Sequence, residues 1–243
     1  MKLIVTDLTR FKNPDIVCLA GINPETGQCI RPMLLNQEKL EYLTFKAIKE
    51  RKVIPGSWLE GGFTKILNLK PPHVEDHSIS SGLKMNGPSS SVDFKNVLDN
   101  SSVNTIQAGF GSQPENRLYS LAKTPPISII TLKLNSPRMQ FQLIVDTGFN
   151  SVKIKAHITD ESGCKLSYLP VTDLGFSDHL GKIRESDPTL AGLNSFLQNQ
   201  TIIYVRLGLT RKYAPTPDRD GYWVQVNGIY SFPNYRQDLR IYD

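Results

Sequence analysis

Two long strand-like segments near the C-terminal end constrain the fold of this chain more than any other feature. Residues 201–212 and 222–231 alternate apolar and polar side chains with a period of two, and the Pro- and Asp-rich segment 213–221 joins them. This pattern is typical of paired strands that turn one face toward a core and the other toward solvent. It predicts a β-rich fold at this end.

Further strand-like segments lie on both sides of a polar stretch. The apolar runs predict strands over 2–8, 15–22, 28–32, 53–70, 127–134, 139–145 and 151–158. Helical spacing predicts helices over 37–51, and over 188–198 with Asp187 as its N-cap. Between them, residues 75–114 are rich in Ser, Asn and Gly, and we interpret them as a long connection with a short helix near 92–98.

The order of these elements indicates a fold class. Three strands, a helical interruption and two more strands are the set expected of a five-stranded barrel of the OB type. The second half has this order, and the first half supplies a similar set of strands. We therefore predict a mainly β protein of two OB-type five-stranded β-barrels with short accessory helices, divided into domains 1–114 and 115–243.

Charge and cysteine content narrow the class of protein. The 243 residues carry a formal net charge of +5, which suits an anionic partner such as nucleic acid and equally describes an ordinary solvated surface. Cys18, Cys29 and Cys164 form no CxxC pair, which argues against a disulfide framework or a structural zinc site. No apolar run approaches the roughly 18 residues of a membrane span. We expect a cytoplasmic protein without a membrane partner.

The polar face of the C-terminal strand pair is the first candidate site. Period-two counting places Tyr204, Arg206 and Lys212 on one exposed face, beside Trp223, Gln225 and Asn227 of the second strand. Aromatic rings stack on bases, basic groups neutralise phosphates, and amides hydrogen-bond to base edges. The alternative interpretation is an amphipathic hairpin whose Tyr and Trp cover a neighbouring helix.

Both ends of the chain carry motifs of a known family. The segments 205–213 (VRLGLTRKY) and 222–233 (YWVQVNGIYSFP), with an opening hairpin of 18–21 (CLAG) and 26–32 (TGQCIRP), resemble the dual OB-containing domain family of bacteria. Cys29 departs from the family pattern, which has a larger residue there, and residues 80–115 match nothing in it. The resemblance implies two OB folds and nucleic-acid binding in bacterial defence or conflict systems. It assigns function to Arg31, Arg206, Thr210, Arg211, Trp223, Gln225 and Tyr230, with structural salt bridges as the alternative role of Arg31 and Arg211.

The strand face and the resemblance together give one prediction. We expect a protein that binds single-stranded DNA or RNA, needs no cofactor and has no catalytic residue. The candidate nucleic-acid-binding residues are Arg31, Tyr204, Arg206, Thr210, Arg211, Lys212, Trp223, Gln225, Asn227 and Tyr230. The alternative function is a protein-interaction or sensor module whose same face docks a partner domain.

One segment favours a third function. His73, Glu75, Asp76 and His77 lie within five residues and have the side chains of a metal-dependent hydrolase. The competing interpretation is a polar segment in which Glu75 or Asp76 pairs with an arginine. No P-loop, GxGxxG or GxSxG motif accompanies this segment.

Overall fold

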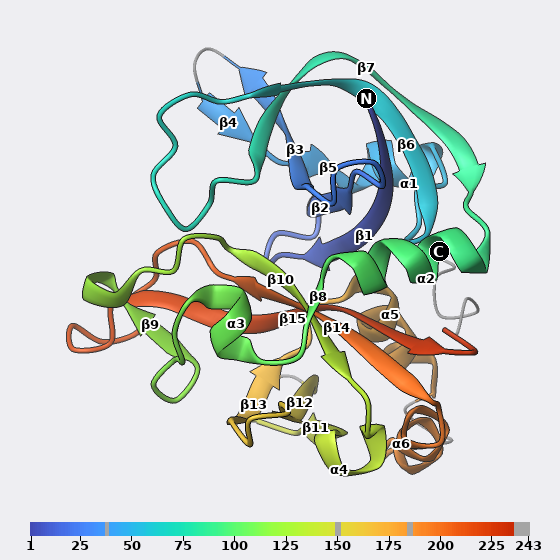
Figure 1. Ribbon diagram of the computed structural model, residues 1–243, viewed down its shortest axis with the longest axis vertical. Helices are drawn as coiled ribbons and strands as arrows, with labels where there is room; N and C mark the ends of the chain where they lie inside the picture. Colours follow the sequence, from blue (N-terminus) through green and yellow to red (C-terminus); the bar gives the residue numbers. More distant parts are fainter. Residues whose placement is uncertain (37–38, 149–151, 184–186, 236–243) are drawn as a thin grey trace.

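The computed structural model describes residues 1–36, 39–148, 152–183 and 187–235, and it is mainly β, with several sheets and short helices (Figure 1). An N-terminal half built on one large sheet lies against a C-terminal half built on two smaller sheets (Figure 1). The predicted mainly β class is confirmed.

The N-terminal half is a seven-stranded sheet in the order β4-β3-β7-β6-β1-β2-β5. Its strands are β1 (Lys2–Arg10), β2 (Ile16–Ile22), β3 (Cys29–Asn36), β4 (Lys39–Glu41), β5 (Leu43–Thr44), β6 (Ser57–Lys65) and β7 (Asp76–Pro88). Because β3 also pairs with β2, the pairings close a ring of β1, β2, β3, β7 and β6, in which β3 and β7 are parallel. Leu3, Val5, Leu19 and Leu59 are in the buried cluster of this half.

The C-terminal half begins with short elements that lead into its main sheet. These are α2 (Ser91–Asn100), β8 (Ser102–Val103), α3 (Ile106–Phe110), β9 (Leu118–Ser120) and the 3₁₀-helix η1 (Leu121–Lys123). A five-stranded sheet then has the order β8-β10-β14-β15-β9, with β10 (Ile129–Leu134), β14 (Ile202–Leu209) and β15 (Gly221–Phe232) at its centre. Ile106 and Phe110 of α3 pack in the same buried cluster as Ile203 and Val224 of this sheet.

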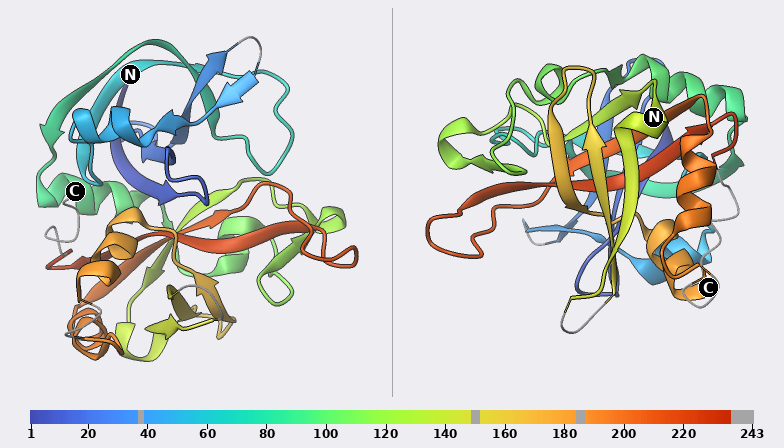
Figure 2. Two further views of the ribbon diagram at one scale, coloured as in Figure 1. Left: turned by 180° about the vertical axis from the view of Figure 1, so that it is seen from behind. Right: turned by 90° about the horizontal axis from the view of Figure 1, so that it is seen from below.

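A second, three-stranded sheet completes the C-terminal half. It consists of β11 (Phe141–Asp146), β12 (Lys153–Thr159) and β13 (Lys165–Pro170), which follow the short helix α4 (Pro137–Gln140). Seen from below, these strands cross β14 and β15 (Figure 2), and both sheets share one buried cluster. Helices α5 (Leu174–Ile183) and α6 (Ala191–Gln198) then lead to β14. The domain boundary near residue 114 stays a prediction.

The two halves are joined by a third apolar cluster. Ile4 and Ile22 of the N-terminal sheet pack there with Tyr204 and Tyr230 of the C-terminal sheet, and with Phe94 of α2. Helix α2 accordingly lies along the junction of the halves (Figure 1). The hydroxyl of Tyr230 donates a hydrogen bond to the carbonyl oxygen of Thr6 at 2.7 Å. The contact between the halves therefore combines apolar burial with satisfied polar groups.

Two predictions made between residues 37 and 114 are wrong. The helix predicted over 37–51 is limited to α1 (Phe45–Glu50), because Thr44 caps it by accepting from the amide of Ala47 and the preceding residues pair as β4 and β5. Residues 37 and 38 lie outside the described residues. The long connection predicted from residue 75 begins with strand β7, whose Ser, Gly and Asn residues mask its pairing with β6. The short helix predicted near 92–98 is confirmed as part of α2.

The helix predicted over 188–198 is confirmed as α6, with a different start. It begins at Ala191, and Leu190 occupies the cap position. Asp187 nevertheless supplies the expected carboxylate, since it accepts from the amides of Ala191 at 2.8 Å and Gly192 at 3.0 Å. The prediction of Asp187 as the N-cap is therefore wrong, although its carboxylate still accepts from amides at the start of the helix.

Candidate nucleic-acid interface

The face predicted to be exposed on β14 and β15 is wrong for three of its residues. Tyr204, Arg206 and Asn227 are buried. Strand β14 lies in the middle of the sheet between β10 and β15, and Tyr204 packs in the apolar cluster shared with the N-terminal half. The period of two correctly grouped the residues of β14 that share a face. It could not indicate that the N-terminal half of the same chain covers that face.

Period-two counting also fails along β15. The register shifts between Arg206, which pairs with Gly228, and Leu207, which pairs with Val226, so Asn227 is an extra residue in the ladder. Val224 and Val226 pack in the C-terminal core with Ile229, whereas Tyr230 packs in the cluster between the halves. The bulge therefore reverses the predicted face of the residues that follow it, Tyr230 included.

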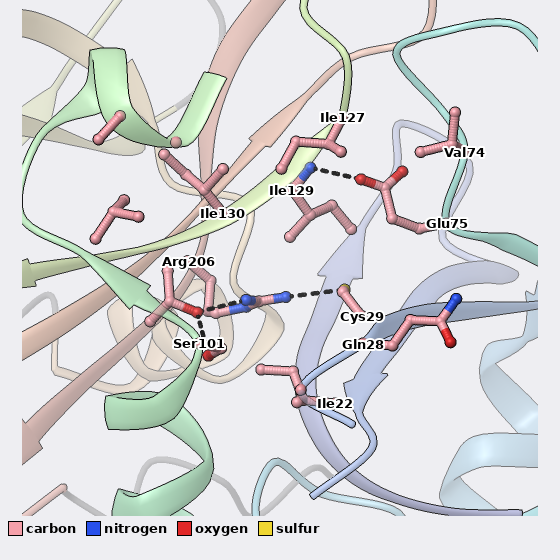
Figure 3. A pocket seen from close by; sticks show the side chains of 15 residues that line it. Ile22, Gln28, Cys29, Val74, Glu75, Ser101, Ile127, Ile129, Ile130 and Arg206 are labelled. Atoms are coloured by element: carbon pink, nitrogen blue, oxygen red, sulfur yellow. Dashed lines mark hydrogen bonds between the residues drawn. The ribbon is translucent and has the colours of Figure 1, made fainter. Parts of the chain in front are cut away.

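Arg206 is a structural cation between the halves. Its side chain is 1% exposed, and its Nε donates to Asp7 Oδ2 at 2.9 Å. Its other nitrogens donate to Thr131 Oγ1 at 2.7 Å and, as Figure 3 shows, to Cys29 Sγ at 3.2 Å. With these partners, the guanidinium has no access to a ligand from solvent.

Tyr204 fits the alternative interpretation, in which an aromatic side chain covers a neighbouring helix. Its hydroxyl donates to Asp99 Oδ1 of α2 at 2.5 Å, and its ring meets that of Phe232 edge-on. Burial is the main cause that raises the pKa of Tyr204, and the Asp99 carboxylate adds to it. Tyr204 therefore anchors α2 to the sheet.

The polar segment after Val74 forms an ion network with Arg31. Arg31 Nε lies 2.5 Å from Asp76 Oδ1, and its Nη2 lies 3.9 Å from Glu75 Oε2. The other oxygen of Asp76 accepts from Arg211 Nη2 at 2.8 Å. The pairing of Glu75 or Asp76 with an arginine is therefore confirmed, and so is the salt-bridge role of Arg31 and Arg211. Within the described parts of the chain, no three His, Cys, Asp or Glu side chains group as metal ligands.

Glu75 carries this network across to the C-terminal half. Its carboxylate accepts from the amide and hydroxyl of Ser128, both at 2.7 Å, and from the amide of Ile129 at 3.1 Å (Figure 3 shows the last of these). Three hydrogen bonds to a buried carboxylate offset the cost of taking it out of water. The segment predicted as a candidate metal site therefore fastens one half of the molecule to the other.

His73 is held neutral beside these arginines. Arg31 Nη2 lies 3.1 Å from Nδ1 of His73, and because a guanidinium can only donate, Nδ1 must accept. The Nε2 atom of His73 therefore carries the proton and donates to the carbonyl oxygen of Thr210 at 3.2 Å. Burial, and then the charges of Arg211 and Arg31, lower the pKa of His73 to about 3. A cationic His73 would lose its bond from Arg31.

A cleft of about 330 Å³ opens beside this network, and we call it the junction cleft. Six of the ten predicted binding residues line it, namely Arg31, Thr210, Arg211, Lys212, Gln225 and Asn227. The remaining lining residues are Thr9, Arg10, Phe11, Cys18, Tyr42, His73, Leu209 and Tyr213. No acidic side chain is among these described lining residues, but two acids outside the lining pair with its cations: Asp76 with Arg31 and Arg211, and Asp220 with Lys212 at 2.9 Å. Basic groups and aromatic rings thus line the cleft.

Aromatic and basic side chains lie together in the junction cleft. The rings of Phe11 and Tyr42 are 4.5 Å apart, and the Arg211 guanidinium lies 5.7 Å from the Tyr42 ring centre. Tyr213 is 59% exposed and Arg10 is exposed. Sequence reasoning missed Arg10, Phe11, Tyr42 and Tyr213. The run Arg10-Phe11-Lys12, an aromatic residue between two cations at the end of a strand, was the available signal for two of them.

Trp223 forms the edge of a second basic surface. Its backbone amide and carbonyl bond to Thr210, and its indole Nε1 donates to the carbonyl oxygen of Tyr213 at 3.2 Å. The guanidinium of Arg219 lies 4.5 Å from the indole centre and that of Arg117 lies 5.7 Å away. Trp223 is half-buried, so part of it remains accessible.

A separate pocket of about 370 Å³ lies on the junction near Cys29 and Arg206 (Figure 3). Burial raises the pKa of the Cys29 thiol to about 12. The thiol is therefore protonated at neutral pH and is a poor nucleophile. Ile22, Ile127 and Ile130 supply apolar walls, and the guanidinium of Arg206 is already bonded to protein groups.

Comparison with known proteins adds no relative to this picture. No protein-family model matches the chain, and no curated protein matches it. In the described parts of the chain, no helix has the length and apolar character that crossing a membrane requires.

Proposed function

We propose that this protein binds single-stranded nucleic acid in the junction cleft. The observation that carries the proposal is the lining of the cleft, which brings Arg10, Arg211 and Lys212 together with the rings of Phe11, Tyr42 and Tyr213. Bases stack on aromatic rings at roughly 1–3 kcal/mol each, and cations along the groove neutralise the phosphates. Gln225 lies in the same lining and offers an amide for base edges.

The strand pairing supports an OB-type fold as part of this proposal. The ring β1-β2-β3-β7-β6 contains five strands, and its first and last pairings are antiparallel while β3 and β7 run parallel. A five-stranded Greek-key ring is the architecture that OB folds use to bind oligonucleotides. We extend the same description to the C-terminal half and, with it, the resemblance to the dual OB-containing domain family.

The cellular setting proposed here follows from that resemblance. It implies a bacterial cytoplasmic protein of a defence or conflict system, and the free thiols of Cys18, Cys29 and Cys164 suit a reducing compartment. A protein-interaction module is the alternative. Association with a partner that persists at high salt, without strand binding, is the result that favours it.

Fluorescence anisotropy with labelled single-stranded DNA and RNA tests the proposal. We expect salt-sensitive binding at micromolar protein, and at least about tenfold weaker binding for Arg10→Gln and for Tyr213→Ala. Arg51→Gln is the matched control, because Arg51 is exposed at the end of α1 and does not line the cleft. Binding that is absent in the wild type, or equal in all four proteins, contradicts the proposal.

A further inference from the structure

A second basic pocket of about 370 Å³ lies beyond Trp223, and we call it the Arg117 pocket. It is built from three separate segments: the loop before β9, strand β13 and the loop between β14 and β15. Arg117, Lys165 and Arg219 line it, and no acidic side chain is found among its described lining residues. Three cations from distant parts of the chain thus converge on one space.

These cations have no carboxylate partner among the residues that the structure describes. In the described parts of the chain, no ion pair joins Arg117, Lys165 or Arg219 to an acid. Of the two acids that flank Arg219 in sequence, Asp218 is hydrogen-bonded to Thr216, and Asp220 pairs with Lys212 at 2.9 Å. Arg117 donates to the carbonyl oxygen of Tyr168, a neutral acceptor. Burial, and then repulsion by the nearby positive charge of Arg219, lower the pKa of Arg117. An anion between them would relieve that repulsion.

The backbone at this pocket is held in an unusual conformation. Asn116, Arg117 and Tyr168 have φ angles of 46°, 67° and 58°, in the left-handed region that residues other than glycine rarely adopt. Such conformations concentrate at ligand-binding sites, where the surrounding structure maintains them. Here they occur in both segments that bring Arg117 toward β13.

We propose that Arg117, Lys165 and Arg219 bind a phosphate group. Two planar guanidiniums are suited to bidentate contact with phosphate oxygens, and an ammonium adds a third positive charge. This inference rests on the proposed function in one respect: the phosphate belongs to a strand that continues from the junction cleft across Trp223. Thr210 lines the cleft and bonds to Trp223, whose indole lies within 6 Å of both arginines, so the two sites adjoin.

Intrinsic fluorescence provides a direct test, since the chain has two tryptophans. In a Trp58→Phe background, Trp223 is the only tryptophan and reports on the Arg117 pocket. We expect a saturable, salt-sensitive change on titration with inorganic pyrophosphate. The affinity should fall at least about tenfold in Arg117→Gln and in Arg219→Gln, and stay unchanged in Arg51→Gln. Thermal unfolding of each variant verifies that the fold is retained.

The outcomes separate this inference from the proposed function. No saturable change, or an equal affinity in the arginine variants, overturns the phosphate site even if the strand binds in the cleft. Pyrophosphate binding that depends on both arginines supports the site even if anisotropy detects no strand. A labelled strand whose affinity falls in Arg117→Gln as well as in Arg10→Gln identifies the phosphate as that of the polynucleotide, whereas an effect on pyrophosphate alone overturns the continuous path.

Discussion

Arg206 illustrates how one residue changes its role when its surroundings are known. The sequence presented it as an exposed phosphate-binding group on a strand face, whereas the structure places it between Asp7, Thr131 and Cys29. Thr6 Oγ1 and Arg206 both donate to Asp7 Oδ2, while Oδ1 has no hydrogen-bond partner among the described residues. A buried carboxylate that depends so strongly on one cation makes that cation important for stability.

Replacing Arg206 therefore tests stability and not binding. We expect Arg206→Met to lower the free energy of unfolding by about 3–5 kcal/mol, because it leaves the Asp7 charge buried without its partner. Adding Asp7→Asn should recover part of that loss. Urea denaturation measures both, with Arg51→Met as an exposed control expected to change stability by less than about 0.5 kcal/mol. If Arg206→Met is as stable as the wild type, the ion pair of Arg206 and Asp7 is not buried.

His73 should make the free energy of unfolding depend on pH. Its pKa is about 3 in the folded protein because of burial and the charges of Arg211 and Arg31, against an ordinary value near 6.5 in the unfolded chain. Between these values the unfolded chain binds one more proton, so stability falls as the pH is lowered through this window. The free energy of unfolding that this residue removes approaches about 1.4 kcal/mol for each pH unit. Denaturation at several pH values should show a flatter profile for His73→Gln, and parallel profiles would contradict it.

Among the secondary-structure elements, the local sequence pattern was sufficient to predict where most strands lie. It was not sufficient to predict which face of each strand is buried. The strands at 2–8, 15–22, 127–134 and 139–145 were predicted near their observed positions, because each has strongly apolar alternation or an apolar run. Strands β7, β9 and β13 were missed because each has few apolar residues in alternation. Strands β7 and β13 pair with the strands directly before them in the chain, whereas β9 pairs with β15, far away in sequence. A bulge such as that at Asn227 cannot be recognised from the amino-acid composition of the strand. The side of the sheet on which Tyr230 lies could therefore not be predicted from the sequence.

The pairing of β15 with β9 can be tested through Gly221. A Cβ added to Gly221 would lie 2.1 Å from the backbone oxygen of Tyr119 in β9, which has no room to move without breaking the pairing. We expect Gly221→Ala to destabilise the protein by about 1–3 kcal/mol. Gly82→Ala in β7 is the matched control, because an added Cβ there meets nothing within 4 Å. Equal unfolding midpoints for the two variants would contradict the pairing.

At the scale of the whole molecule, the candidate site arises from the contact between the halves. Arg31 and Tyr42 come from the N-terminal half and Thr210, Arg211 and Gln225 from the C-terminal half, yet all line one cleft. Six of the cleft residues were identified from the sequence, because the opening hairpin that contains Arg31 and the C-terminal strand pair both contribute to the lining. Arg10 and Phe11 were missed although the run Arg10-Phe11-Lys12 was a signal for them, and Tyr213 was missed although it directly follows Arg211 and Lys212. Tyr42 had no such signal, since it joins the residues of the C-terminal half only through the packing of the two halves.

The same arrangement predicts how salt acts on strand binding. Each cation that neutralises a phosphate contributes about −0.7 to the slope of log K against log salt concentration for a single strand. Arg10→Gln and Lys212→Gln should therefore each make the slope shallower by about that amount, and Arg51→Gln should leave it unchanged. Anisotropy titrations at several salt concentrations measure it. A common slope in all variants would remove these two cations from the strand path.

The most direct test of the account is to map where a strand touches the protein. Ultraviolet cross-linking of a single-stranded oligonucleotide, followed by mass spectrometry of the peptides, identifies residues in contact with bases. We expect cross-links at Phe11, Tyr42 or Tyr213 in the junction cleft, and at Trp223 beside them. Cross-links confined to surfaces away from the cleft, such as α4 or α6, would contradict the proposed function.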